Sequence, residues 1–289
     1  MSAVHPVGTV SGALDRFATV GLDELTARAA LQTRVDRKYV LPARVVTALL
    51  AGLDDDARVL RIDGRQHLAY ESVYFDTPDL TSYLGAARRR RRRFKVRTRT
   101  YLDTAACFVE VKTRGPRGAT VKDRLPHDPS ARDRLTVDAL GFAGEALNAA
   151  RVPWPPDPRF APTLVSRYHR STLLLPGGPG RPDARLTVDT GLVWSPAGGG
   201  DALALDGLAV VETKTGATPC AADRLLWHAG HRPVRISKYG TGLAALDPRL
   251  PATPWRRVLD RHVAPASAMA CAGAGGPGAP GRAAGVSVP

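Results

Sequence analysis

In several segments of this chain, basic side chains occupy every second position. The clearest case is Phe94–Tyr101, in which Lys95, Arg97 and Arg99 alternate with apolar and hydroxyl residues. Alternate side chains of a β-strand point to the same face, whereas a helix would distribute these charges around its axis. The segment is therefore predicted to be a strand with one strongly cationic face.

The same alternation recurs along the chain. In residues 107–113, Glu110 and Lys112 share one face, and the opposite face is apolar through Val109 and Val111. Further charged or polar pairs at spacings of two or four lie in other strand-like segments: Asp36 with Lys38, Lys122 with Arg124, Tyr168 with Arg170, Arg185 with Asp189, and Glu212 with Lys214. We therefore expect a sheet with one charged and one apolar face.

About eight strands are predicted from these patterns. They cover residues 35–41, 68–75, 94–101, 107–113, 119–125, 163–175, 184–193 and 208–213. Helices are indicated at 42–53, 78–87, 130–150 and 219–230, and three of them begin with proline, which lacks an N–H that a first turn leaves unpaired. We expect residues 1–30 to form a helical segment packed on a main domain of residues 31–262, and the Ala-, Gly- and Pro-rich residues 263–289 to form a disordered tail.

A charged sheet face most commonly points to solvent, with the apolar face on a core. Solvated faces usually mix both signs of charge, however, and here Arg and Lys dominate with single acids between them. Like charges 4 Å apart cost roughly 1 kcal/mol in water and about 4 kcal/mol at an effective dielectric constant of 20. If the basic face points into the lumen of a closed sheet, that lumen requires an anionic ligand.

The composition also favours an anionic partner. The chain has 289 residues with 41 Lys and Arg against 27 Asp and Glu, a net charge of +14 and a pI near 10.4. A net positive charge of this size leaves nucleic acid, anionic membranes and phosphate compounds as possible ligand classes.

The three cysteines show no CxxC spacing, so neither a zinc site nor a disulfide framework is indicated. No apolar run could span a bilayer and no leader is visible, so a cytoplasmic protein is expected.

Short motifs follow one another in an order that is more specific than any one of them. They are Arg34–Tyr39 (RVDRKY), Tyr74–Thr77 (YFDT), Lys95–Tyr101 (KVRTRTY), Phe108–Thr113 (FVEVKT), Tyr168–Arg170 (YHR), Arg185–Thr190 (RLTVDT), Val211–Lys214 (VETK) and Ile236–Tyr239 (ISKY). This succession, from about residue 33 to residue 242, resembles the VTC domain, the polyphosphate-polymerase domain of the vacuolar transporter chaperone complex.

The resemblance implies the triphosphate tunnel metalloenzyme fold. This is an α+β architecture built on a closed antiparallel eight-stranded β-barrel with flanking helices, whose lumen binds triphosphate through basic side chains and a divalent metal ion through glutamate. The related adenylate cyclase and thiamine-triphosphatase branch carries an ExExK motif on the first strand. Here that strand reads Arg34-Val35-Asp36-Arg37-Lys38, which favours the VTC arrangement over that branch.

By motif position, the resemblance implies which residues form the site. The expected catalytic set is Lys38, Arg97, Arg99, Lys112, Arg170 and Arg185, and the expected substrate-binding set is Lys122, Arg124, Lys214, Arg235 and Lys238. The last two precede an expected glycine-containing turn. Glu212 and Glu110 are the expected ligands of Mg²⁺ or Mn²⁺, with ordinary ion pairing to neighbouring lysines as the alternative role.

Phosphoryl transfer to a phosphate acceptor needs positioned cations more than acid–base groups, because the attacking oxygen is already anionic. Together with the resemblance, this leads us to expect a metal-dependent polyphosphate polymerase that uses a nucleoside triphosphate, with ATP as the first choice, as donor. The alternatives are a triphosphatase and a non-catalytic module that binds polyphosphate or nucleotide. The resemblance also allows a membrane partner protein that would hold the chain at the inner face of a membrane.

Residues Arg88–Arg93 form an unbroken run of six arginines between a predicted helix and the cationic strand. Alone, such a run would suggest a patch for nucleic acid or a membrane. No helix-turn-helix, zinc-finger or aromatic RNA-binding motif accompanies it, so nucleic acid is the least favoured ligand. We expect the run to act as an entrance funnel or a partner patch.

Overall fold

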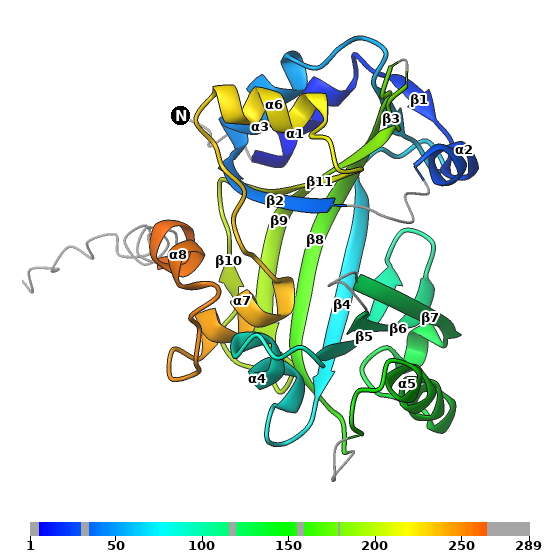
Figure 1. Cartoon of the computed structure of the whole chain (residues 1–289), viewed down its shortest axis with the longest axis vertical. Coiled ribbons are helices and arrows are strands. Elements are labelled where there is room, and N and C mark those ends of the chain that lie inside the picture. The colour runs from blue at the N-terminus through cyan, green and yellow to red at the C-terminus, as the bar shows by residue number, and fades with distance from the viewer. Residues whose placement is uncertain (1–5, 30–34, 116–119, 155–158, 179, 265–289) are drawn as a thin grey trace, which may run out of the picture.

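The computed structural model describes residues 6–29, 35–115, 120–154, 159–178 and 180–264, which form one sheet with helices packed on it (Figure 1). Eight strands make up the main path of the sheet. Their order is β2 (Val35–Pro42), β11 (Leu208–Thr215), β9 (Ala184–Pro196), β8 (Ala161–Leu175), β4 (Leu68–Asp76), β5 (Phe94–Tyr101), β6 (Ala106–Arg114) and β7 (Thr120–His127). All neighbours on this path are antiparallel.

Three short strands lie off the main path, which brings the sheet to eleven strands. β1 (Ala18–Val20) pairs in parallel with β3 (Arg58–Leu60), β3 also pairs with β8, and β10 (Leu203–Ala204) pairs with β9. These strands were not predicted, because two or three residues are too short to show a period. The eight predicted strands correspond to the eight of the main path.

The expected closed barrel is wrong. The two edge strands, β2 and β7, do not pair with each other within the described residues. The backbone N–H of Val234 donates to the carbonyl of Lys38 at 2.7 Å, so the segment around Val234 contacts the edge of β2 where a closing strand would pair. At the other edge, β7 carries the exposed Lys122 and Arg124, and charged edge strands resist further pairing.

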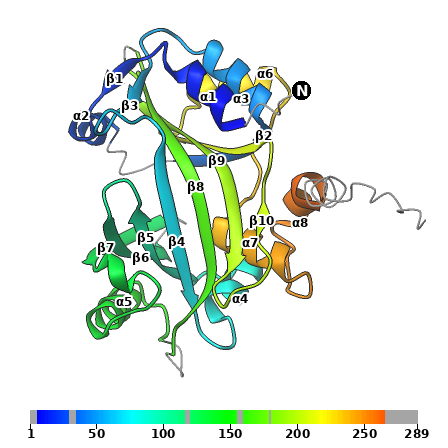
Figure 2. The ribbon, with the colours of Figure 1, turned by 180° about the vertical axis from the view of Figure 1, so that it is seen from behind.

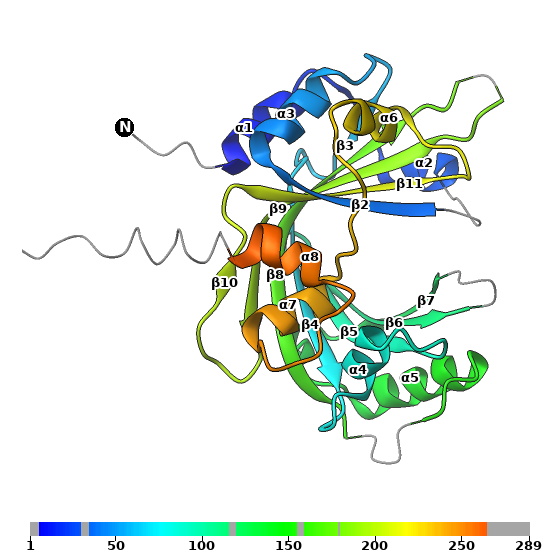
Figure 3. The same cartoon turned by 60° about the vertical axis from the view of Figure 1, so that its left-hand side comes forward.

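The open sheet is instead folded over on itself (Figure 3). β2 and β11 lie in one layer and β5, β6 and β7 in another, with the long strands β4, β8 and β9 crossing between them. The register of β8 shifts against β9 between Arg167 and His169, and that of β4 against β8 between Tyr74 and Phe75. Such bulges bend strands and increase their twist, so they help to bring the two layers face to face.

Helices cover the apolar outer face of the upper layer (Figure 2). α1 (Pro6–Leu14), α3 (Ala43–Ala51) and α6 (Ala221–His228) pack near β2, β9 and β11 in one core that includes Tyr39 and Val211. α3 and α6 were predicted within one to three residues of these bounds. The outward positions of the alternating strands therefore face a core, as the sequence indicated.

The lower layer has its own core. α5 (Val137–Ala149), preceded by the 3₁₀ turn η2 (Pro129–Ala131), packs on Val109 and Val111 of β6. These two valines form the predicted apolar face of their strand. Their neighbours in sequence, Glu110 and Lys112, consequently face the space between the two layers, together with the charged positions of the other strands.

A third group of helices packs beside the long strands. It comprises α4 (Thr81–Ala87), α7 (Lys238–Leu246), α8 (Arg256–Val258) and the π-helical turn η3 (Leu259–Val263), around the buried rings of Trp194, Trp255 and Tyr239. α7 begins where a glycine-containing turn was expected. The sequence signal was ambiguous, because two glycines in five residues are more typical of a turn than of a helix.

The glycines of α7 allow its close approach to two tryptophans. A Cβ on Gly240 would lie 2.1 Å from Cζ2 of Trp255, and a Cβ on Gly242 would lie 2.6 Å from Cδ1 of Trp194. Both tryptophans are buried. The glycines are therefore required for helix packing and not for a turn.

Gly242→Ala is expected to lower the free energy of unfolding by about 2–3 kcal/mol, because the added methyl must displace the Trp194 ring from a packed core. Gly141→Ala in α5 is the matched control, since Gly141 is exposed and a Cβ there meets nothing within 4 Å. The control should gain about 0.5–1 kcal/mol. Urea unfolding followed by tryptophan fluorescence measures both. Similar losses in the two variants would show that α7 is not tightly packed.

The predicted N-terminal segment of residues 1–30 contains α1 and α2 (Leu22–Arg28), and α1 packs on α3 and β9. The division of the chain at residue 31 stays a prediction. From residue 265 onward the predicted tail lies outside the described residues, while Val263 is buried in the third core. Within the described ranges, no helix combines the length and the apolar character needed to cross a membrane.

Candidate functional site

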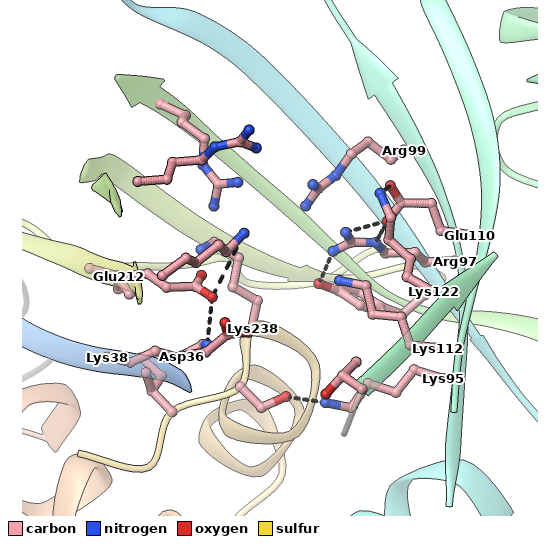
Figure 4. A pocket seen from close by; sticks show the side chains of 18 residues that line it. Asp36, Lys38, Lys95, Arg97, Arg99, Glu110, Lys112, Lys122, Glu212 and Lys238 are labelled. Carbon is pink, nitrogen blue, oxygen red and sulfur yellow. Dashed lines mark hydrogen bonds and ion pairs between the residues drawn. The ribbon is translucent and has the colours of Figure 1, made fainter. Parts of the chain in front are cut away.

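A cavity of about 360 Å³ lies between the two layers, on the charged side of the sheet (Figure 4). Among the described residues, ten basic and three acidic side chains line it. All six residues of the expected catalytic set are among them: Lys38, Arg97, Arg99, Lys112, Arg170 and Arg185. Lys122, Lys214, Lys238, Glu110 and Glu212 from the expected substrate and metal sets line it as well. The basic face of these strands therefore encloses a cavity and is not a solvated outer surface.

Two carboxylates, Glu212 and Asp189, form ion pairs with basic side chains on the strands β2 and β8. Glu212 on β11 lies opposite Lys38 on β2 and accepts a hydrogen bond from its Nζ at 2.8 Å. Asp189 on β9 lies opposite Arg170 on β8 and accepts from its Nε at 2.6 Å and its Nη2 at 2.8 Å. Lys238 of α7 also donates to Asp189. The register of the sheet thus fixes the direction of Lys38 and Arg170, and the position of α7 fixes that of Lys238.

A third carboxylate does the same in the lower layer. Glu110 on β6 lies opposite Arg97 on β5 and accepts from its Nε at 2.9 Å and also from its Nη2. Its other oxygen accepts from Lys122 at 3.3 Å. Arg97 in turn donates to the hydroxyl of Tyr74 at 3.1 Å. Glu110 is only 1% exposed, so this pair is held rigidly inside the protein.

Burial alone would raise the pKa of these three carboxyls, but the surrounding cations outweigh it. The arginines and lysines around Glu110 hold its pKa far below the usual range, and the lysines around Glu212 do the same. Arg170 and Lys238 lower the pKa of Asp189 to about 2. All three carboxyls are therefore anionic at neutral pH, and none is suited to act as a general base.

Three lysines form a row across β5, β6 and β7. The register places Lys95 opposite Lys112, and Lys112 opposite Lys122. Lys95 donates to Ser237 Oγ at 2.9 Å, but Lys112 makes no hydrogen bond or ion pair with any residue that the structure describes. Like charges directly opposite each other destabilise a sheet. Among the described residues, the centre of this lysine row therefore has no ion-pair partner, although the charges of Glu110 and Glu212 act on Lys112 from a greater distance.

The pKa values of the lysine row reflect that crowding. Burial, followed by the charge of Arg97, lowers the pKa of Lys95 to about 8 and that of Lys112 well below the usual lysine range. Burial also lowers the pKa of Lys122, against the opposing effect of Glu110. An anion bound among these ammonium groups would relieve the repulsion and raise all three pKa values.

Arg99 is held by neutral partners. Its Nη2 donates to Tyr168 Oη at 2.6 Å and its Nε to Ser72 Oγ at 3.4 Å. Burial would raise the pKa of Tyr168, but Arg99 and Arg170, with Lys238, lower it below the usual value. No described carboxylate lies within ion-pair distance of Arg99. Its guanidinium is thus oriented but not neutralised, which suits it to bind an anion bidentately.

The N-terminus of α7 borders the cavity, through Ser237 and Lys238. Ser237 caps the helix by accepting a hydrogen bond from Gly240 N at 3.1 Å, and it also accepts from Lys95. Helix N-termini carry a partial positive charge. The helix therefore adds to the positive potential that the side chains create.

The carboxylates allow a test of which residues could hold a metal ion. Within the described ranges, no three acidic, His or Cys side chains gather into a metal-binding group. Mg²⁺ is, however, commonly held by one or two carboxylates together with substrate phosphates. Both contacts that Glu212 makes with described lysines use Oε1, whereas Glu110 uses both oxygens for Arg97 and Lys122. The donor set therefore fits a substrate-bound metal ion better at Glu212 than at Glu110.

Two residues of the expected substrate-binding set lie outside the cavity. Arg124 is exposed on β7, and its guanidinium lies over the Phe108 ring, 5.1 Å from the centroid. Arg235 lines a second hollow beside the cavity. The structure adds Lys95, which lines the cavity, and Asp189, which holds two of its bases. Both stood on charged strand faces in the sequence, but only the register shows what they contact.

Comparison with known families and structures gives several similarities. A family model for the VTC domain matches residues 33–247, a range that includes every residue lining the cavity. Similar solved structures include a conserved hypothetical protein from Pyrococcus furiosus, with 11% identity, 68% of this chain and 88% of that chain covered, and a TM-score of 0.36. No curated protein matches the chain.

Two further solved structures show a similar degree of likeness. A protein from Hippeastrum, described as having a dominant triphosphatase activity, shares 15% identity, with 72% of this chain and 94% of that chain covered and a TM-score of 0.37. A protein from Pyrococcus horikoshii shares 11% identity, with 68% and 88% covered and a TM-score of 0.35.

Proposed function

This chain belongs to the VTC domain family, and on that premise we propose that its cavity binds a nucleoside triphosphate, with ATP as the first candidate, and transfers the terminal phosphoryl group to a polyphosphate chain. The observation that carries the proposal is the lysine row, Lys95, Lys112 and Lys122, whose charges face one another without a sufficient counter-charge. A protein maintains such a row at the expense of its stability, which is reasonable only if an anion binds there.

The role of each basic side chain in the cavity would depend on whether it is already paired with a carboxylate. Arg97, Arg170 and Lys38 are fixed by their carboxylate partners, so they present donors to phosphate oxygens without reorganising when the substrate arrives. Lys112 and Arg99 form no ion pair with a carboxylate in the part of the chain that the structure describes, so each would gain its ion pair on binding. Phosphoryl transfer depends mainly on this kind of positioning and charge stabilisation.

A divalent ion, Mg²⁺ or Mn²⁺, would be held by Glu212 and would supply neutralisation of the charge that develops on the transferred group. Lys38 binds Oε1 of Glu212 and so keeps the carboxylate oriented. Glu110 is a weaker candidate for the same role, because both of its oxygens already accept hydrogen bonds.

A phosphate acceptor is favoured over water. Hydrolysis requires a base that activates water, and no histidine lines the cavity within the described residues. Glu110 and Glu212 both have pKa values held below the usual range, so they are poor bases. The lysines of the row have lowered pKa values in the free protein, but bound donor phosphates would raise those values and keep the lysines protonated. The end of a polyphosphate chain is already anionic and needs no such activation. The excess of cationic side chains in the cavity would offset the repulsion between this chain end and the phosphates of the donor.

The fate of radiolabelled γ-phosphate tests the proposal. With Mg²⁺ or Mn²⁺ and ATP, label should enter an acid-insoluble polymer that a polyphosphate-specific hydrolase degrades. Label recovered only as orthophosphate would instead establish a triphosphatase. Tight binding of triphosphate with no release or transfer of label, under either metal, would leave a non-catalytic binding module.

Triphosphate binding is also expected to be coupled to proton uptake. Lys95 has a pKa of about 8 in the free protein, and that of Lys112 lies well below the lysine range, so part of the lysine row is unprotonated at mildly alkaline pH. A bound polyanion raises these pKa values, and affinity should therefore fall as the pH rises from about 7 to about 9. Isothermal titration calorimetry in buffers of different ionisation enthalpy measures the uptake. Lys95→Met should reduce it, and binding heats that do not depend on the buffer would contradict the coupling.

A further inference from the structure

A second hollow opens directly beside the cavity. This mouth groove has a volume of about 870 Å³ and lies between the arginine run, the end of β6 and the segment that precedes α7. It shares Asp36, Lys38, Lys95 and Ser237 with the cavity. A ligand that fills the cavity could therefore extend into the mouth groove without crossing bulk protein.

The mouth groove is lined by arginines from four separate parts of the chain. One of them, Arg37 on β2, forms an ion pair with Asp223. The other five are Arg89, Arg91 and Arg93 from the run, Arg114 from the end of β6, and Arg235 from the segment before α7. None of the five forms an ion pair with a described carboxylate. Burial, followed by the charges of Arg114 and Arg235, lowers the pKa of Arg93. The three elements thus bring like charges together, as the lysine row does inside the cavity.

The arginine run is divided by position. Arg89, Arg91 and Arg93 line the mouth groove, whereas Arg88 and Arg92, from the same run, do not. Only half of the run therefore faces the groove. This division provides an internal control, because arginines of the same charge and nearly the same place in the sequence differ in what they face.

The backbone at Arg89 gives an independent indication. α4 ends in a turn in which Arg89 N donates to Ala86 O at 3.2 Å and Arg90 N to Gly85 O at 2.8 Å. In this helix ending, the Arg89 position takes the left-handed conformation, with φ of 54°, and glycine is the residue best suited to it. An arginine there is unfavourable for the backbone, which indicates that its side chain serves another purpose.

We propose that the mouth groove is a second anion site, which binds the phosphates of a polyphosphate chain that extend beyond those held in the cavity. The inference rests on the proposed function in that it takes the cavity to hold the chain end. Guanidinium groups bind phosphate oxygens in pairs, and a row of them along an open groove matches a repeating phosphate chain. The site would favour long chains over short ones as acceptors.

Polyphosphate suits the mouth groove better than other polyanions. Single-stranded nucleic acids bind through exposed aromatic side chains on which bases stack. Among the described residues that line the groove, the one aromatic residue is Trp255, which is 5% exposed. A membrane surface is flat and would meet arginines on a convex surface, whereas these arginines line a hollow that is continuous with the cavity.

The test compares two double variants of equal charge. Arg89→Gly with Arg91→Ser removes two arginines of the mouth groove, and glycine at position 89 relieves the backbone, so folding is retained. Arg88→Ser with Arg92→Ser removes two arginines that lie outside the groove. The affinities of both variants and the wild type for tripolyphosphate and for long-chain polyphosphate are measured by calorimetry at several salt concentrations, with the unfolding midpoint as a check on folding.

The groove variant should bind long-chain polyphosphate roughly tenfold more weakly than the control variant and with a shallower salt dependence, while both bind tripolyphosphate like the wild type. Equal losses in both variants would overturn the inference, because the run would then act only through its general field. Unchanged affinity of the groove variant for long-chain polyphosphate would overturn it as well. A wild type that binds long chains but not tripolyphosphate would refute the proposed function and leave the groove standing.

Discussion

Glu212→Gln is expected to abolish most phosphoryl transfer while leaving triphosphate binding nearly intact. Gln keeps the size of the side chain and can still accept the hydrogen bond from Lys38, but it lacks the anionic oxygen that a hard divalent cation requires. Turnover should fall by at least about a hundredfold, because the metal ion acts mainly on the charge of the transition state. A γ-phosphate transfer assay, beside calorimetry with a non-hydrolysable triphosphate, measures the two effects separately.

Arg99→Ala is the comparison for this variant. Arg99 is oriented by Tyr168 and carries no carboxylate partner, so its guanidinium should contact phosphate in both the ground state and the transition state. Both affinity and turnover should therefore fall in Arg99→Ala. If Glu212→Gln lost binding and turnover together, as expected for Arg99→Ala, Glu212 would be a structural ion-pair partner and not a metal ligand.

Glu110→Gln is expected to cost about 3–5 kcal/mol of unfolding free energy at neutral pH. The change leaves Arg97, which is 5% exposed, without its anionic partner, and an unpaired charge inside a protein is costly. It also removes the carboxylate that accepts from Lys122. Thermal and urea unfolding measure the loss, and tripolyphosphate should restore more stability to this variant than it adds to the wild type, because it supplies the missing negative charge.

Glu71→Gln is the matched control. Glu71 on β4 is buried and accepts from two arginines, Arg132 and Arg167. The side chains of those arginines are 50% and 58% exposed, so they can return to water when the carboxylate is lost, and the loss should be near 1 kcal/mol. Tripolyphosphate should give Glu71→Gln no special rescue. If the two variants lost equal stability and were rescued equally, the cavity would not be an electrostatically strained site.

The faces of the strands could be predicted from the sequence because they depend on a local period. Alternation in 94–101 placed Arg97 and Arg99 on one face, and the structure finds both in the cavity. What lies along that face is set by strand pairing, which no local pattern contains. Arg124 shows the difference, since it shares a face with Lys122 but lies over Phe108, outside the cavity.

Closure of the sheet could not be read from the sequence for the same reason. Whether two edges meet depends on what else competes for them, and at β2 the competitor is the segment around Val234. That segment has no periodic pattern of its own. Most of the site residues that the family resemblance implied line the cavity. The resemblance also brought the expectation of a closed barrel, which the described part of this chain does not form.

The packing of α7 couples the aromatic core to the cavity, so substitutions in one should affect the other. Lys238 and Ser237 at the start of the helix border the cavity, and Gly240 and Gly242, only a few residues along, touch the buried tryptophans. A substitution in that aromatic core would shift the helix and with it two groups of the cavity. A systematic mutational scan should therefore find positions around Trp194 and Trp255 that reduce activity in proteins that are still folded, and compensating changes should arise as pairs within this core.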